Sequence, residues 1–141
     1  MNSRNIDDLD PRVAALCRKH LAACDAADID ILVTSTYRSR DSQDALYAQG
    51  RTAPGAKVTN AKGGQSFHNY RLAYDVVPLR NGKPVWGTSK PEDAALWKKV
   101  GELGVAAGLE WAGHWKTFKE FPHFQWTGGL KIADLQAGRR P

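Results

Sequence analysis

The segment LAYDVVPL, residues 72–79, places the carboxylate of Asp75 inside an otherwise apolar run. The run is rich in aliphatic and aromatic residues, which predicts a β-strand. Burying a lone carboxylate in such a strand costs several kcal/mol unless another group pairs with it. The fold must therefore supply a partner for Asp75.

The rest of the chain predicts an α+β fold. Asp10-Pro11 forms an N-cap followed by proline at the first helical position, and apolar spacing continues a helix to about residue 26. Asn81-Gly82 is a strong β-hairpin signal. Further helices are expected over residues 39–49 and 89–108, further strands over residues 29–38, 83–87 and 123–126, and a last helical turn over residues 131–138. With no repeat or linker in view, residues 1–141 are expected to form a single domain, a small antiparallel sheet flanked by helices.

The composition fits a globular protein that needs no disulfide. Hydrophobic residues make up 42% and charged residues 25% of the 141 residues, enough to form a core. Cys17 and Cys24 lie seven positions apart on one predicted helix. Their Cα atoms would be about 10 Å apart, beyond disulfide reach, so both are expected to be apolar core thiols.

The charge and the N-terminal segment restrict where the chain can act. The segment MNSRNIDDLDPRV is polar and acidic, unlike a secretory signal, so synthesis in the cytoplasm is expected. The first 30 residues carry six acidic and four basic side chains, a net −2 that leaves +7 for the rest of a chain whose total is +5. Such a charge suits nucleic acid, anionic lipid or an acidic cell-wall polymer, and does not choose among them.

His68 is the first candidate partner of Asp75, because it lies in the loop that enters the strand. Alternation along a strand puts Asp75 on one face with Ala73, whose small side chain leaves room for an ion. Histidine nitrogen and aspartate oxygen suit a zinc ion, and a third ligand must then come from elsewhere.

Three other histidines could complete the site. His20 is expected on the surface of the first helix, and His114 is a spare histidine left out of the metal set. His123 begins the strand HFQW, and Glu120 stands three residues before it in KEFPHFQW. A turn before that strand is required to swing Glu120 towards the metal, because residues three apart in a strand face opposite ways. This spacing arises by chance in many proteins, and Asp75 paired with backbone amides or an arginine is the alternative.

Three motifs resemble one known family. SFHNYRLAYD, residues 66–75, resembles the Ser-x-His-x-x-Gly-x-Ala-x-Asp motif of the zinc D,D-carboxypeptidase and L-alanyl-D-glutamate peptidase family, which includes phage endolysins and vancomycin-resistance D,D-peptidases. EFPHFQW resembles its second element, and STYRSRDSQDALYAQGR resembles the segment with its active-site arginine, here Arg38. Arg71 stands where the motif has glycine, so positive φ is not expected there and a cation is expected near the site mouth.

The resemblance implies a hedgehog/D,D-peptidase-like fold and a catalytic zinc site. Zinc would be bound by His68, Asp75 and His123, with Glu120 as the base that takes a proton from the attacking water. Arg38 would stabilise the oxyanion or clamp a substrate carboxylate.

Further residues are candidates for contacts around this site. Ser66 is expected to hydrogen-bond near the ligands, and Tyr37 and Gln43 are candidates for substrate contact. Trp111 and Trp115 flank the proposed site and are candidates for stacking on sugar or peptide.

The expected function is that of a phage-type endolysin, an L-alanyl-D-glutamate endopeptidase acting on bacterial peptidoglycan. A D-alanyl-D-alanine carboxypeptidase is the alternative, with residues 51–64 expected to choose between them. A non-catalytic binder of cell wall or nucleic acid is a second alternative. The enzyme is expected to work as a monomer without nucleic acid or stable membrane insertion, reaching the cell wall in the periplasm after release from the cytoplasm.

Overall fold

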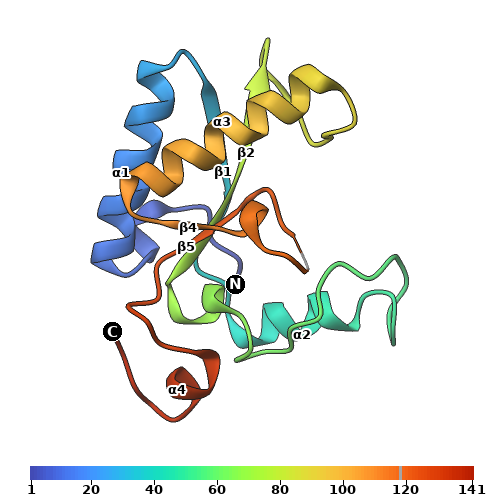
Figure 1. Ribbon diagram of the computed structural model, residues 1–141. Coiled ribbons are helices and arrows are strands. Elements are labelled where there is room, and N and C mark those ends of the chain that lie inside the picture. The colour runs from blue at the N-terminus through green and yellow to red at the C-terminus, as the bar shows by residue number, and fades with distance from the viewer. Residues whose placement is uncertain (118) are drawn as a thin grey trace.

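The structure, a computed structural model, describes residues 1–117 and 119–141 (Figure 1). The α-helices are α1 (Pro11–Ala26), α2 (Arg40–Ala48), α3 (Pro91–Ala107) and α4 (Ile132–Gln136). The strands are β1 (Asp30–Ser35), β2 (Ala73–Arg80), β3 (Lys83–Pro84), β4 (Glu110–Trp111) and β5 (His123–Gln125), and short 3-10 helices cover Ile6–Asp8, Phe67–Tyr70 and Ala112–His114. The predicted α+β class is confirmed.

The strands form one antiparallel sheet in the order β1-β2-β5-β4, and β3 pairs with the end of β2. β2 lies between β1 and β5, and its register places Asp75 opposite Ser35 on one side and His123 on the other. The predicted hairpin is confirmed, since Asn81 (φ 53°) and Gly82 (φ 74°) form the left-handed turn between β2 and β3. The sheet thus brings together Asp75 and His123, which are 48 positions apart in the sequence.

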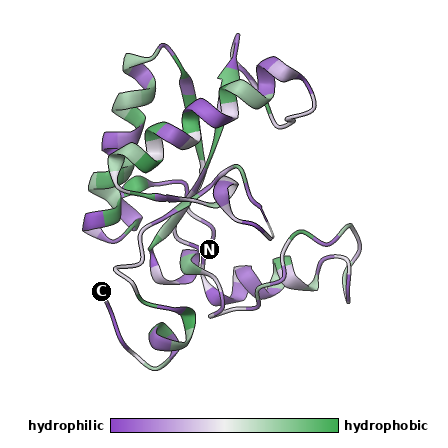
Figure 2. Ribbon diagram, in the orientation of Figure 1, coloured by the Kyte–Doolittle hydropathy of each residue, from purple (hydrophilic) through white to green (hydrophobic). Residues whose placement is uncertain are grey.

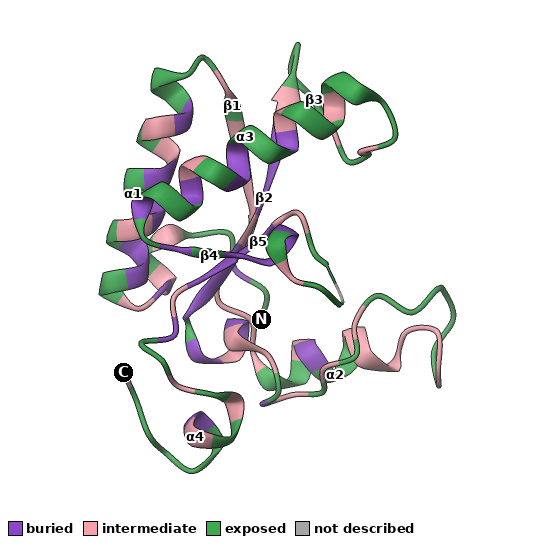
Figure 3. Cartoon of the chain, in the orientation of Figure 1, coloured by how far each residue is buried: buried purple, intermediate pink, exposed green. Residues whose placement is uncertain are grey.

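Two long helices cover one face of the sheet. α1 and α3 lie against the sheet, whereas α2 and the segment after it extend away from it (Figure 1). Both long helices carry hydrophobic and hydrophilic stripes (Figure 2), and β2 and β5 are buried over most of their length (Figure 3). The core beneath the helices includes Tyr74, Val76 and Phe124 from alternate strand positions.

Side chains cap the first two α-helices, and the cap that Asp10-Pro11 predicts for the first is confirmed. Asp10 accepts a hydrogen bond from the backbone N–H of Arg12 at the start of α1, and Ser39 caps α2 in the same way through Ser42. Cys17 and Cys24 are free and buried, as expected for two core thiols. No described helix combines the length and the apolar character that crossing a lipid bilayer requires.

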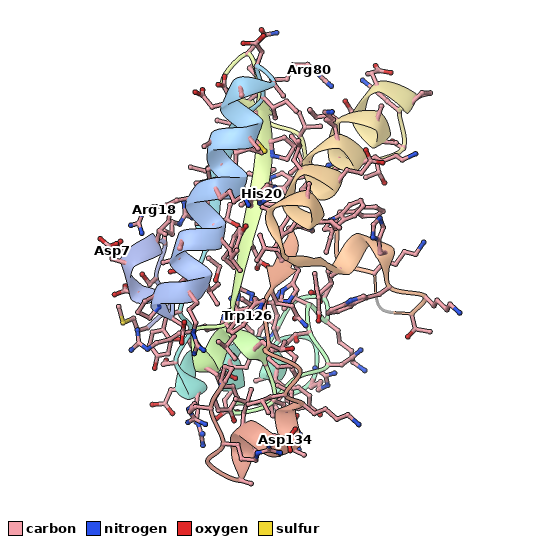
Figure 4. All side chains as sticks on the ribbon, turned by 60° about the vertical axis from the view of Figure 1, so that its left-hand side comes forward. Asp7, Arg18, His20, Arg80, Trp126 and Asp134 are labelled. Atoms are coloured by element: carbon pink, nitrogen blue, oxygen red, sulfur yellow. The ribbon has the colours of Figure 1, made fainter. Side chains whose placement is uncertain are left out.

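The surface position predicted for His20 is wrong. His20 is fully buried between α1, β2 and α3 (Figure 4). The Tyr74 hydroxyl lies 2.7 Å from its Nδ1, and its Nε2 lies 2.8 Å from the Val100 carbonyl oxygen. Because a carbonyl oxygen only accepts, Nε2–H donates to Val100 and the Tyr74 hydroxyl donates to Nδ1. The sequence pattern of the helix does not predict these two hydrogen bonds of His20 inside the core.

The expectation for Arg71 is also wrong. Its φ is +65°, so the position that holds glycine in the family motif does need a left-handed backbone here. Its guanidinium lies over the Tyr37 ring, 3.9 Å from the centroid, and donates to the carbonyl of Asp8. These contacts hold the cation against the N-terminal segment, away from the cleft described below.

Candidate metal centre

His68, Asp75 and His123 converge on one point at the edge between β2 and β5. One donor atom from each residue lies within 4.8 Å of the others. Asp75 Oδ1 is 3.2 Å from His68 Nε2 and 3.3 Å from His123 Nδ1. Both histidines are buried, and Asp75 remains 23% exposed towards the cleft. The half-buried carboxylate therefore has a pair of histidines as its nearest partners, with Arg38 Nη2 farther away at 3.8 Å.

Each histidine is oriented by an acceptor behind it. His68 lies on the 3-10 helix Phe67–Tyr70, and its Nδ1 is 2.8 Å from the Thr36 carbonyl oxygen. His123 Nε2 is 2.7 Å from Oε1 of Gln125. Since both partners accept, the far nitrogen of each ring carries a proton, and the nitrogen that faces Asp75 is Nε2 of His68 and Nδ1 of His123.

This donor set fits a zinc ion. Ligand distances of 2.0–2.2 Å in a tetrahedral site put ligand atoms about 3.4 Å apart, close to the separations from Asp75 to the two histidines. Two nitrogens and one carboxylate oxygen are ligands of catalytic zinc, which keeps its fourth position open. The hydrogen bonds behind both rings are of the kind that supports metal-binding histidines.

The electrostatics of the three residues are strongly coupled. Burial alone would raise the pKa of the Asp75 carboxyl, but the charge of His68 and hydrogen bonds from both histidines lower it well below its usual range. Burial lowers the pKa of His123, and the hydrogen bond and charge of Asp75, with the charge of Glu120, outweigh it and raise that pKa. A negative carboxylate thus stays in place to hold a cation.

Glu120 lies beside the three residues without joining them. Its Oε2 is 3.7 Å from His123 Nδ1, and its side chain is half-exposed. Phe121 and Pro122 form a turn, and the N–H of His123 donates to the Glu120 carbonyl across it. The turn expected before this strand is present, and it brings Glu120 to the same face as His123.

Arg38 is held near the carboxylate by two side chains. Its Nη1 donates to Gln43 Oε1 at 2.9 Å, its Nη2 donates to Ser35 Oγ at 3.1 Å, and Nη2 is 3.8 Å from Asp75 Oδ2. Its Nε is buried and has no hydrogen-bond partner among the described residues. Gln43 in turn donates to the Ala61 carbonyl, which connects the guanidinium to the long loop of residues 51–64.

Ser66 acts on the backbone. Its hydroxyl caps the 3-10 helix by accepting from the N–H of His68 at 3.3 Å, and it lines the cleft. This contact fixes the backbone of His68, the first of the two histidines.

A cleft of about 710 Å³ opens over the three donors. Its walls include Val58, Thr59 and Ala61 from the long loop and Trp115, whose ring centroid is 5.6 Å from that of His123. The loop therefore faces the space in which a substrate would lie.

Three aromatic candidates lie outside the cleft lining. Trp111 is buried and its indole N–H donates to the Phe121 carbonyl, so it packs in the core. Tyr37 faces Arg71, and the exposed His114 packs edge-on against Trp111. Of the aromatic residues considered from the sequence, Trp115 is the one that borders the site.

Two residues behind the site were not assigned a role from the sequence. Gln125 is buried, and its amide nitrogen donates to Glu110 Oε2 at 2.9 Å. Glu110 belongs to β4, a strand of two residues that is too short to give a periodic signal. The only signal for Gln125 was its place two residues after His123, on the same face of a strand.

The chain is similar in sequence to peptidases named for peptidoglycan and for D-alanyl-D-alanine. Residues 59–126 match a family described as D-alanyl-D-alanine carboxypeptidase. The peptidoglycan L-alanyl-D-glutamate endopeptidase CwlK of Bacillus subtilis (strain 168) is 38% identical over 122 residues, which cover 84% of this chain and 73% of CwlK.

Solved structures share the fold. The L-Ala D-Glu endopeptidase ChiX of Serratia marcescens superposes with a TM-score of 0.64 at 22% identity, covering 96% of this chain and 92% of ChiX. The vancomycin resistance D,D-pentapeptidase VanY, solved in complex with Zn(II), gives a TM-score of 0.60 at 15% identity, covering 91% of this chain and 83% of VanY. On the similarity to CwlK, with the matching fold, the chain belongs to the D-alanyl-D-alanine carboxypeptidase and L-alanyl-D-glutamate peptidase family of metallopeptidases.

Proposed function

We propose that residues 1–141 form one zinc peptidase domain that hydrolyses the L-alanyl-D-glutamate bond of peptidoglycan stem peptides. The observation that carries the proposal is the convergence of His68, Asp75 and His123 on the floor of the cleft. The choice of bond rests on the similarity to CwlK, which is named for that activity.

Zinc would be held by the three donors, where it supplies Lewis-acid activation of water and of the scissile carbonyl. Glu120 is the proposed general base. Its half-exposed carboxylate faces the cleft next to His123, so it can take a proton from the attacking water and return it to the leaving amine. Glu120 is not among the three residues whose donor atoms all lie within 4.8 Å of one another, and Asp75 occupies the position between the two rings, so Glu120 is left for proton transfer.

Arg38 is the proposed electrophilic group. It is fixed by Ser35 and Gln43, so its positive charge is preorganised beside the cleft. There it would stabilise the oxyanion or bind a substrate carboxylate. Ser66 and Gln43 would position His68 and Arg38, and contact of Tyr37 with substrate gains no support from its place outside the cleft lining.

The proposed partner is the bacterial cell wall. The net charge of +5 favours an anionic polymer over a neutral one. We propose that the enzyme acts there as a monomer of the endolysin type, without nucleic acid and without stable insertion into a membrane.

Mass spectrometry of digested peptidoglycan tests the proposed bond. New N-terminal D-glutamate with release of the rest of the stem is the expected result. Release of single D-alanine instead would make the chain a D,D-carboxypeptidase, in line with the description of the matching family. Binding without any cleavage would leave a non-catalytic wall binder and refute the proposal.

The roles of Glu120 and His123 are tested by a pair of substitutions. Glu120→Ala should keep its zinc and lose activity by about 10²–10⁴-fold, the range for a positioned general base. His123→Ala should lose zinc together with activity, because a ligand is removed. Zinc content and hydrolysis are measured on both. A metal-free Glu120→Ala variant would make Glu120 a ligand, and a His123→Ala variant with tightly bound zinc would remove His123 from the site.

A further inference from the structure

A chain of hydrogen bonds leads from the metal site to the far edge of the sheet. His123 and Gln125 share one face of β5, and the strand register places Glu110 of β4 opposite Gln125. His123 Nε2 is 2.7 Å from Gln125 Oε1, and Gln125 Nε2 is 2.9 Å from Glu110 Oε2. Ala73 of β2 lies opposite Gln125 on the other side, and its small side chain leaves room for the amide.

The orientation of the Gln125 amide is decided by Glu110. A glutamine amide presents an acceptor at one end and donors at the other, and the two ends have nearly the same shape. A carboxylate can only accept, so Glu110 takes the NH₂ end and turns the oxygen towards His123. That oxygen requires a proton on His123 Nε2, which leaves Nδ1, the nitrogen that faces Asp75, as the one that can give up its proton to a metal.

The opposite amide orientation would work against a metal. The NH₂ group would then face His123 Nε2 and favour a ring with its proton on Nδ1, the atom that faces Asp75. His68 does not have this ambiguity, because its outer nitrogen meets the backbone carbonyl of Thr36, which has one orientation. The two histidines are therefore oriented by different means, one by backbone and one by side chains.

We propose that Glu110, an exposed residue outside the cleft lining, is a positioning residue for zinc, acting through Gln125 to hold His123 with Nδ1 free to bind. The inference rests on the zinc site proposed above. It assigns to β4 a role in metal binding, and to a surface carboxylate an effect on a buried ligand two hydrogen bonds away.

Zinc affinity is the first measurement, by competition with a chromophoric chelator on the full chain. Gln125→Leu removes the acceptor and should weaken zinc binding roughly 10–100-fold, the usual effect of losing such a partner. Glu110→Lys replaces the acceptor by a donor, which favours the inverted amide, and should weaken zinc binding by about tenfold or more. Glu110→Ala removes the preference for one orientation of the Gln125 amide without favouring the opposite one. It should therefore weaken zinc binding less than Glu110→Lys does. Glu102→Lys, an equal charge reversal at an exposed carboxylate of α3, is the matched control and should leave the affinity unchanged.

Nuclear magnetic resonance of the zinc-loaded protein separates positioning from a charge effect. The Nε2–H of His123 should give a protected ring N–H signal in the wild type that is lost or shifted in Gln125→Leu and Glu110→Lys. The Nδ1–H signal of His68, bonded to Thr36, serves as the internal control and should persist.

The outcomes are distinct. If wild-type protein binds zinc and Glu110→Lys binds it within about twofold of wild type, or Glu110→Lys leaves the His123 signal unchanged, the inference is wrong while the proposed function stands. A wild type that binds no zinc refutes both. Glu110 is exposed, so Glu110→Lys decides the question even if Gln125→Leu fails to fold.

Discussion

The two faces of the β2–β5 pair serve opposite purposes, although a buried histidine lies on each. On the face towards α1 and α3, Tyr74 and Phe124 lie opposite each other and pack with His20, whose ring centroid is 4.5 Å from that of Phe124. On the other face, the next pair in the register is Asp75 and His123. A shift of one position along each strand separates a core from a candidate metal site.

Both faces bury a histidine, and only one of them is a candidate ligand. His20 uses both ring nitrogens in hydrogen bonds to Tyr74 and Val100, which leaves no lone pair to bind anything else. His123 satisfies one nitrogen with Gln125 and leaves the other facing a carboxylate and a cleft. Their pKa values move in opposite directions, since burial lowers that of His20 while Asp75 and Glu120 overcome burial at His123. Burial of a histidine is thus a poor sign of function. A ring nitrogen that faces a cleft, while the other is held by a hydrogen bond, is a better one.

Asp75→Ala breaks the metal face and should have the largest effect. Two histidines remain, so the protein should be metal-free at stoichiometric zinc, inactive on peptidoglycan, and no longer stabilised against heat by added zinc. Metal content, hydrolysis and melting temperature with and without zinc check this. Asp93→Ala is the control. Asp93 is also a carboxylate in an ion pair, with Arg80, and it does not belong to the group of three candidate ligands. An Asp75→Ala protein with stoichiometric zinc and normal activity would remove Asp75 from the ligand set.

Phe124→Ala breaks the core face and should act on stability alone. Phe124 is fully buried, and a Cβ at Gly104 would lie 2.4 Å from its ring, so the packing there is close. Removing the ring should cost about 3–5 kcal/mol of unfolding free energy. Below its lowered melting temperature the variant should still bind one zinc per chain, because the side chain points away from His123. Denaturant unfolding and zinc content are the measurements, and a folded variant without zinc would show that the faces are not independent.

Much of this division could be predicted from the sequence because strands alternate strictly. The pairing of His123 with Gln125 on one face, the turn before His123 and the hairpin at Asn81-Gly82 all follow from local rules, and the structure confirms them. The prediction that His68, Asp75 and His123 converge depends on their spacing, which is a weak signal alone, and on the resemblance to a known family. No local rule predicts that β2 pairs with β5.

The three misses have different causes. His20 shares a helix face with the apolar Cys17 and Cys24, but its polar ring predicts exposure, and only the docking of α3 shows that Val100 and Tyr74 satisfy that ring. The arginine side chain at position 71 argues against a positive φ. The left-handed backbone there is set by the end of the 3-10 helix that carries His68. Glu110 was overlooked because a strand of two residues has no period to detect.

His20 offers the finest test of the contrast between the faces, through the pH dependence of stability. Burial lowers the pKa of His20 below its ordinary 6.5, with the hydrogen bond to Val100 opposing in part. The unfolded chain therefore binds a proton at this residue more readily than the folded chain, so stability is fully present above about pH 6.5 and is lost as the pH falls below it. The slope from this residue is at most about 1.4 kcal/mol for each pH unit.

His20→Gln isolates that contribution, because an amide can meet both partners and does not titrate in this range. Chemical unfolding of wild type and variant, both with zinc removed by a chelator, is compared from about pH 7.5 down to about pH 5. The titration of Asp75 and His123 is common to both proteins and cancels in the difference. The stability of wild type relative to the variant should fall on acidification and level off above about pH 7. A difference that is flat over the whole range would mean that His20 binds its proton equally well folded and unfolded, and that the core face tolerates a charged histidine.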